Sequence, residues 1–163
     1  RYKRGIGVSS CWYGCGNTAL PNPSTIRLGV TVDGILVLHQ GAADIGQGAN
    51  TVIPQICADA LGVPLASITM VNGDTALTPD CGKTSASRQT FITGKAAMLA
   101  GQALRQQILR LGNLGDEATI DLHQGKIIVS NGDKQQAINL GEMAPNTYGY
   151  VLMAEETYNP PTE

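Results

Sequence analysis

The sequence predicts an α+β domain with mixed β-sheet structure and two main helices. Three observations lead to this prediction: strand-like alternation over 25–38, helical spacing of apolar residues over 51–61 and again over about 87–111, and closely spaced turns over 118–140. A chain of 163 residues can bury one core but is short for two domains. We therefore expect a single domain over residues 1–163.

The first half predicts a hairpin followed by a helix. Residues 25–32 alternate apolar and polar side chains, and the Asp-Gly pair at 33–34 favours the two-residue turn that leads into the apolar run 35–38. A loop of small residues occupies 41–50, and 51–61 has the apolar spacing of a helix. A polar loop is thus predicted to lead directly into a helix start.

The second half predicts a strand over 67–71, a polar loop over 72–84 and the second helix. Turns at Gln-Gly and Asn-Gly divide 118–140 into a β meander. Residues 145–163 lack firm periodicity and end in Pro-Pro-Thr-Glu, so we expect a linker-like tail there.

The second helix is expected to bury one broad face, because several apolar side chains recur at helical spacing. The predicted face comprises Phe91, the aliphatic stem of Lys95, Met98, Leu99 and Leu104. The segment Gly141-Glu142-Met143, directly after the meander, is predicted to start another helical turn.

Charge and hydropathy exclude several classes of partner. The formal net charge is −2 and the basic residues are dispersed, so we expect no nucleic-acid partner. No apolar run reaches the roughly 20 residues of a membrane span. The sequence predicts a soluble domain.

The four cysteines are predicted to be free thiols, because a domain of this size and hydrophobicity does not need a disulfide framework. Cys11 and Cys15 have a spacing that metal sites use, but no second cysteine or histidine pair follows. We expect no metal ligand in the chain and a reducing, cytoplasmic location.

Two polar loops at predicted helix starts indicate a site for an anion. The first contains Gly46-Gln47-Gly48 and the second is 84–90, Thr-Ser-Ala-Ser-Arg-Gln-Thr. Unpaired backbone N–H groups and the helix dipole both favour an anion at a helix N-terminus. Structural explanations remain open, since Thr84 or Ser87 can cap the helix and the glycines can serve a tight turn.

The ordered motifs 44–51, 73–75, 78–80 and 84–90 resemble the cofactor-binding segments in the large subunit of molybdenum hydroxylases, the xanthine dehydrogenase and aldehyde oxidoreductase family. The resemblance covers most of the chain and implies a molybdopterin-binding domain of that type. It also implies that this domain is part of a larger subunit.

The resemblance implies a role for each matching residue. It places Gly46 and Gln47 against the pterin, with Gln47 near the ligand sphere of the metal, and includes Gly48 among the cofactor-binding residues. It assigns the phosphate end of the cofactor to a second group, in which Arg88 is expected to pair with phosphate: Thr84, Ser87, Arg88, Gln89 and Thr90.

The resemblance further implies a molybdopterin cofactor with molybdenum, in the cytosine dinucleotide form of bacterial members. Iron–sulfur clusters and FAD are expected on partner domains or subunits. Family members hydroxylate an aldehyde or N-heterocycle carbon with oxygen derived from water. The family's catalytic glutamate, in a Gly-Glu-Pro context, and its Gly-Gly-Phe-Gly-Gly loop are absent from this sequence. We therefore assign no catalytic residue and expect the isolated chain to be inactive.

Two other functions remain as alternatives. One is a module that binds or carries a pterin cofactor without catalysis. The other is a small stand-alone hydrolase using Ser87 or Cys57, although the sequence places no histidine beside either as a base.

The two histidines and the acidic pair are predicted to have no role in the site. His39 ends a predicted strand and is interpreted as a structural histidine, while His123 is assigned to a turn. Glu155 and Glu156 are expected to be solvated.

Overall fold

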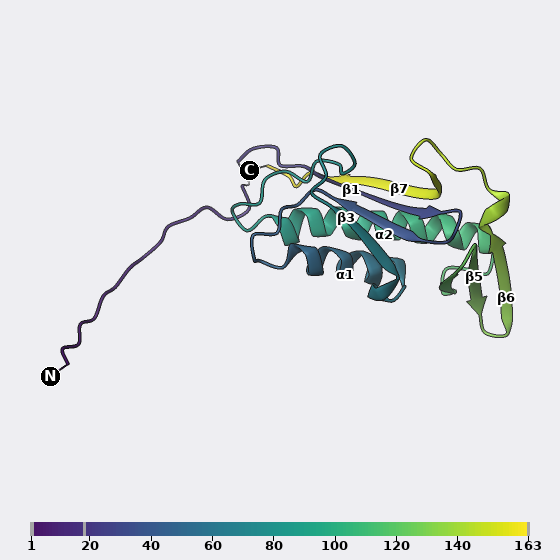
Figure 1. Ribbon diagram of the computed structural model, residues 1–163, viewed down its shortest axis with the longest axis horizontal. Coiled ribbons are helices and arrows are strands. Elements are labelled where there is room, and N and C mark those ends of the chain that lie inside the picture. Colours follow the sequence, from purple (N-terminus) through teal and green to yellow (C-terminus); the bar gives the residue numbers. More distant parts are fainter. Residues whose placement is uncertain (1, 18, 163) are drawn as a thin grey trace.

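The computed structural model describes residues 2–17 and 19–162. A four-stranded sheet lies against two helices, and a three-stranded sheet stands at the far end of the longer helix (Figure 1). In chain order the elements are β1 (Ser24–Thr31), β2 (Leu36–Gln40), α1 (Ala49–Leu61), β3 (Ile68–Asn72), α2 (Gln89–Gly112), β4 (Thr119–His123), β5 (Lys126–Asn131), β6 (Lys134–Asn139) and β7 (Tyr150–Tyr158). Short 3₁₀ turns occupy Leu65–Ser67 and Leu140–Glu142.

The larger sheet is mixed, with the strand order β3-β2-β1-β7. The predicted hairpin is present as the antiparallel pair β1 and β2, and β7 is antiparallel to β1 on its other side. β3 runs parallel to β2, so the connection between them crosses over through α1. The predicted α+β class, with mixed β structure and two main helices, is confirmed.

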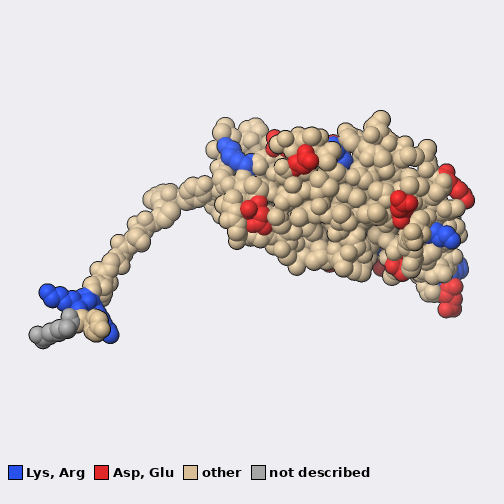
Figure 2. Space-filling view, viewed as in Figure 1, with Lys and Arg blue, Asp and Glu red and all other residues tan. Residues whose placement is uncertain are grey.

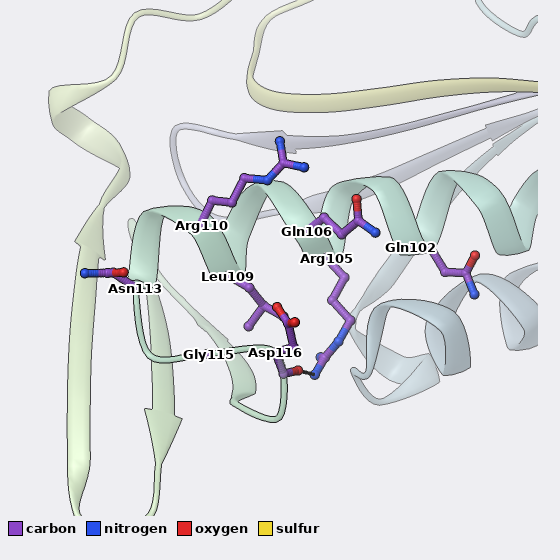
Figure 3. Close-up of a pocket in the computed structure, with 8 residues that line it drawn as sticks. All are labelled: Gln102, Arg105, Gln106, Leu109, Arg110, Asn113, Gly115 and Asp116. Carbon is purple, nitrogen blue, oxygen red and sulfur yellow. Dashed lines mark hydrogen bonds between the residues drawn. The ribbon is translucent and has the colours of Figure 1, made fainter.

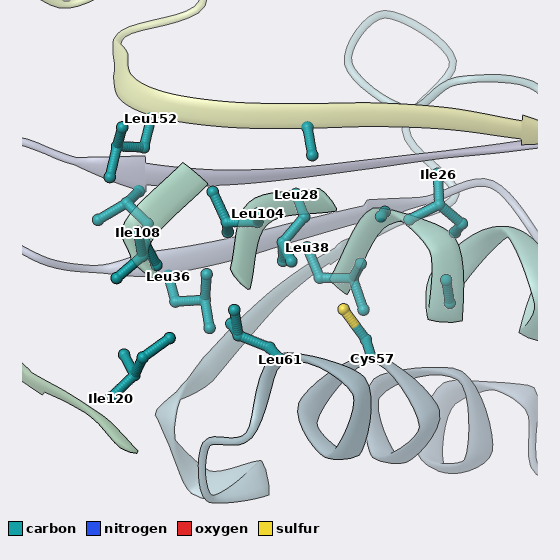
Figure 4. Close-up of a cluster of buried hydrophobic side chains, with 14 of the residues drawn as sticks. Ile26, Leu28, Leu36, Leu38, Cys57, Leu61, Leu104, Ile108, Ile120 and Leu152 are labelled. Atoms are coloured by element: carbon teal, nitrogen blue, oxygen red, sulfur yellow. The ribbon is translucent and has the colours of Figure 1, made fainter. Parts of the chain in front are cut away.

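The core lies between this sheet and the two helices (Figure 4). Alternate residues of β1, including Ile26 and Leu28, turn toward the helices and are fully buried. Leu61 from α1 and Leu104 from α2 meet them from the helical layer. The packing fixes both helices against one face of the sheet, with the loops before α1 and α2 at the same end (Figure 1).

The buried face of α2 differs from the predicted one. Leu104 is buried as predicted and Lys95, Met98 and Leu99 are half-buried, but Phe91 is 61% exposed and Ile92, outside the predicted face, is buried. A Cβ added at Gly101 would lie 2.8 Å from the carbonyl oxygen of Cys57 in α1. Small side chains therefore let the two helices approach closely, and large apolar residues do not mark the whole contact.

The predicted meander is confirmed as the antiparallel sheet β4-β5-β6. The segment predicted to start a helix after it is the 3₁₀ turn Leu140–Glu142. Among the described residues, no helix is long and apolar enough to cross a membrane.

The prediction of a linker-like tail over 145–163 is wrong for most of that range. Tyr150–Tyr158 forms β7, which pairs with the whole of β1 and buries Leu152 and Ala154. The partner strand, β1, lies near the other end of the chain, so no local turn in the sequence predicts that β7 pairs with it. β7 is therefore the edge strand of the larger sheet on the side of β1.

Candidate functional site

The loop before α1 is held by the carboxylate of Asp44. Its Oδ1 accepts hydrogen bonds from the backbone N–H groups of Gly46 (2.9 Å) and Gly48 (3.2 Å), and its Oδ2 accepts one from Asn50 (3.0 Å). Gly46 and Gly48 have positive φ angles of 105° and 86°, which glycine adopts without strain. The N-terminus of α1 therefore already has an anion, supplied by the chain itself.

These hydrogen bonds make the stability of the fold depend on the ionisation of Asp44. The backbone N–H groups of Asn50 and Gly46 are the main causes that lower the pKa of Asp44 below its ordinary value. A carboxyl whose pKa is lower in the folded state stabilises the fold above its unfolded pKa and loses this effect as pH falls through the folded pKa.

We predict that Asp44→Asn makes the stability of the domain less dependent on pH below about pH 4, where an unfolded aspartate titrates. Urea unfolding between pH 2 and pH 5 would measure this effect, with Asp133→Asn as an exposed control. Equal pH slopes for the wild type and Asp44→Asn would contradict the assigned role.

The loop before α2 has an unusual backbone. Ala86 and Ser87 both adopt the left-handed conformation, with φ angles of 50° and 55°. Arg88 occupies the N-cap position, and no side chain caps the helix. The structural alternative, in which Thr84 or Ser87 caps α2, is therefore not what the structure contains. In contrast to α1, the start of α2 has no carboxylate bound to it within the described residues.

Arg88 is fully buried at this helix start. Its guanidinium donates hydrogen bonds to the carbonyl oxygens of Cys81 (2.6 Å), Lys83 (3.0 Å), Asn22 (3.3 Å) and Pro23 (3.0 Å). The Nε atom has no partner among the described residues, and the only ion pairs found there involve other side chains. Burial lowers the pKa of Arg88 and the nearby charge of Asp80 opposes this shift, but arginine stays charged in proteins, so a positive charge with no carboxylate in ion-pair contact lies beneath this loop.

A cavity of about 580 Å³ lies between the two loops. The hydroxyl of Thr84 donates to the carbonyl oxygen of Ala43 (2.8 Å) and so joins the second loop to the first. The lining residues come from both loops and from the N-terminal segment: Tyr13, Ile45, Gln47, Thr84, Ser85, Ala86, Ser87, Arg88, Gln89 and Thr90. The two loops singled out from the sequence thus line one cavity.

The predicted site residues differ in how free their side chains are. Ser87 and Thr90 are exposed. Gln89 is 4% exposed, and its amide nitrogen lies 3.3 Å from both the carbonyl oxygen of Gly82 and the hydroxyl of Thr84. The exposed Gln47 side chain accepts from the N–H of Ile45 (2.7 Å) and donates to the carbonyl of Ala43 (3.1 Å), closing its own loop.

Sequence reasoning missed three residues here. Asp44 caps α1, and an aspartate just before a glycine-rich helix start is a signal that could have identified it. Tyr13 lines the cavity, and its hydroxyl accepts a hydrogen bond from the N–H of Ala86 (3.3 Å). Ile45 also lines the cavity, although it is 76% exposed. No sequence pattern places Tyr13 beside a loop more than seventy positions later.

A second cavity, of about 760 Å³, lies along the C-terminal half of α2 (Figure 3). Its arginine, Arg105, donates to the carbonyl oxygens of Leu61 (3.1 Å), Asp116 (3.2 Å) and Ala118 (2.8 Å). These bonds tie the end of α1 to the segment before β4, and Gly62 leaves room for the guanidinium. The contacts of Arg105 are structural, and none of the predicted site residues lies here.

The two histidines and Glu155 do not line the cavity between the loops. His39 is buried, and its Nε2 atom bonds the hydroxyl of Tyr150 (2.5 Å); burial is the main cause that lowers its pKa. His123 pairs with Asp121 (2.9 Å) in the small sheet. Glu155 is exposed, as expected, and its carboxylate also contacts Arg27 at 2.6 Å.

The thiols show no catalytic arrangement. All four cysteines are free, and burial raises the pKa of Cys57 to about 12. Among the described residues, no group of three or more metal-ligating side chains is suitable for a metal ion. Neither histidine lines the cavity that contains Ser87, so the hydrolase alternative lacks a base there.

A family model described as the molybdopterin cofactor-binding domain matches residues 1–163. The chain belongs to this family. The resemblance noted in the sequence is thereby confirmed, and the loops described above lie within a molybdopterin cofactor-binding domain.

Relatives of this molybdopterin cofactor-binding domain are much longer proteins. The putative xanthine dehydrogenase molybdenum-binding subunit of Escherichia coli K12 is 29% identical over 180 residues, which cover 98% of this chain and 23% of that protein. The chain thus spans less than a quarter of that relative.

Solved structures share the fold. Quinoline 2-oxidoreductase from Pseudomonas putida 86 aligns with a TM-score of 0.62 at 23% identity, covering 86% of this chain and 19% of that one. Aldehyde oxidoreductase from Desulfovibrio desulfuricans aligns with a TM-score of 0.61 at 22% identity, covering 91% and 14%.

Proposed function

We propose that this domain holds the phosphate end of a molybdopterin cofactor at the start of α2, as part of a molybdenum hydroxylase. The buried charge of Arg88 is the observation that carries the proposal. A buried cation that forms no ion pair with a carboxylate favours an anion nearby, and the uncapped N-terminus of α2 favours the same charge.

The first loop leaves open space beside its backbone. A Cβ added at Gly46 or Gly48 would meet no heavy atom within 4 Å, so a ligand can approach the first loop closely. Ser87 and Thr90 offer exposed hydroxyls at the second loop. The α1 start is not an equivalent site, because Asp44 already places a carboxylate there, bonded to the N–H of Asn50 in the first turn and to the loop N–H groups of Gly46 and Gly48.

The roles of individual residues follow from their present contacts. The Nη atoms of Arg88 donate to carbonyls, so in this proposal Arg88 acts through its charge and by holding the loop, rather than by the direct phosphate bonds expected from the sequence. Thr84 and Gln89 join the loops. Ser87, Thr90 and the first N–H groups of α2 then contact the phosphates.

The complete enzyme needs components beyond this domain. When bound, the molybdenum cofactor supplies the oxidation centre at which a carbon is hydroxylated with oxygen from water. We propose the cytosine dinucleotide form, an aldehyde or N-heterocycle substrate, and electron transfer through iron–sulfur and flavin groups on other domains or subunits. A cytoplasmic location belongs to the same proposal, and the four free thiols support it.

The Gly46-Gln47-Gly48 loop would lie at the pterin end, near the metal. There Gln47 positions the loop, because its amide bonds the backbone at Ile45 and Ala43. Loss of these two bonds changes loop geometry without removing the phosphate contacts.

We predict that Gln47→Ala in the complete enzyme lowers turnover per bound molybdenum about tenfold, as expected for about 1–2 kcal/mol of lost positioning. Molybdenum content should fall less than twofold. Metal analysis and turnover would be measured together, with Gln136→Ala on β6 as an exposed control. Full turnover per molybdenum, combined with lost cofactor, would instead make Gln47 an anchoring residue.

A non-catalytic carrier would use the same cavity, so the two functions differ in whether the isolated chain retains the cofactor. The cavity lining in this chain comes from two loops and Tyr13. We therefore propose that further walls come from the longer subunit, and that the isolated chain has no hydroxylase activity.

A further inference from the structure

The N-terminal segment 2–12 extends away from the folded body (Figure 1). Four large apolar side chains in it are almost completely exposed: Tyr2 (101%), Ile6 (98%), Val8 (94%) and Trp12 (100%). Within the described part of the chain, no hydrogen bond involves this segment. Such a concentration of exposed apolar surface marks a contact surface in most proteins.

The apolar side chains follow a strand pattern. Tyr2, Ile6, Val8 and Trp12 all occupy even positions, so they would share one face of an extended strand. The same positions also include Arg4, near the free end, and Ser10, so the face is mainly rather than wholly apolar. The odd positions carry Lys3, Gly5, Gly7, Ser9 and Cys11. Two glycines within three residues disfavour a helix, and the segment contains no proline to interrupt strand pairing.

The segment is a regular part of the family domain. The family model matches residues 1–163, and the alignment with the E. coli subunit covers 98% of the chain. That relative is more than four times the length of the match, so most of such a subunit consists of other segments. A sheet in one of those segments is the partner that an unpaired strand requires.

We propose that residues 2–12 add as a β-strand to the edge of a sheet in another domain of the same subunit, with the apolar face toward that domain's core. The odd face, which includes Lys3 and Ser9, lies toward solvent. The inference shares with the proposed function the premise of a longer subunit, but it does not depend on cofactor binding.

The attachment point gives this strand a functional consequence. Directly after it, Tyr13 accepts a hydrogen bond from the N–H of Ala86, and the N–H of Gly16 donates to the carbonyl of Ala86 (2.6 Å). Ala86 is one of the two left-handed residues in the loop before α2. Docking of the strand would therefore place the partner domain beside the cavity. Figure 2 shows basic side chains at the free end of the segment, away from the folded body.

Amide hydrogen exchange of the peptide covering 2–12 tests the proposal. In the isolated chain we expect exchange near the rate of unfolded peptide, and in the complete subunit at least about 100-fold slower exchange. Unprotected amides in the complete subunit would overturn the strand. Protection in the isolated chain that rises with its concentration would also overturn it, in favour of pairing between copies. Protection that requires lipid vesicles would overturn it in favour of a membrane surface.

Two neighbouring substitutions test the period of two. Val8→Asp on the apolar face should abolish protection in the complete subunit, while Ser9→Asp on the opposite face should retain it. Neither substitution should change the Tm of the isolated chain, because neither side chain contacts the folded body. Equal effects of both variants on amide exchange would contradict a strand with one face toward the partner domain and one toward solvent. Exchange is read independently of molybdenum content, so failure of cofactor binding would leave this result interpretable.

Discussion

Replacing Arg88 by alanine is expected to lower the free energy of unfolding by about 3 kcal/mol or more, since a buried acceptor left without a donor costs about 1–3 kcal/mol. The guanidinium joins two segments that are distant in sequence, 22–23 and 81–83, through their carbonyl oxygens. Alanine would leave these four acceptors facing an empty space. Urea unfolding of the isolated chain measures the effect.

The geometry of the arginine matters as much as its charge. Lysine carries a single ammonium group, so Arg88→Lys cannot reach acceptors on both sides and should recover less than half of the lost stability. Arg110→Ala, an exposed change on the same helix, should alter the free energy by no more than about 0.5 kcal/mol. A stability for Arg88→Ala that matches the Arg110→Ala control would refute the role of Arg88 in joining the loops.

Elements that depend on neighbouring residues were predictable from the sequence. The hairpin of β1 and β2 and the meander of β4 to β6 each follow turn residues that lie between the paired strands. β7 was missed because it pairs with β1 across almost the whole chain. The buried face of α2 was predicted correctly at Leu104 but missed elsewhere, because Gly101 and its small neighbours, rather than large apolar residues, allow the close contact with α1.

The candidate site was partly predictable for a similar reason. Glycines and hydroxyl residues before a helix indicate an anion site, and both loops indeed line one cavity. The contacts of Arg88 were not predictable, because its partners are backbone carbonyls, which every residue type carries. Asp44 removes the start of α1 from the candidates, a distinction that required its three hydrogen bonds to be seen.

The central claim is that an anionic group of the cofactor binds at the first turn of α2. Thr90 lies in this turn, is exposed, and lines the cavity. A glutamate at this position is favourable for the helix itself, by about 0.3–1 kcal/mol, because it complements the helix dipole. The same carboxylate would occupy the free N–H groups in the first turn of α2 and repel phosphate. Thr90→Glu should therefore weaken cofactor binding without lowering the stability of the domain.

The decisive measurement is the molybdenum content per complete subunit for Thr90→Glu beside Thr90→Gln, its neutral counterpart of the same length. We predict that Thr90→Glu loses at least about tenfold in cofactor affinity, equivalent to about 1.4 kcal/mol, and binds correspondingly less molybdenum at limiting cofactor. Thr90→Gln removes the hydroxyl contact without adding a charge, so it should lose clearly less cofactor affinity than Thr90→Glu, and both variants should unfold at or above the wild-type temperature. Full molybdenum content in a stably folded Thr90→Glu subunit would contradict binding of the phosphate end at α2.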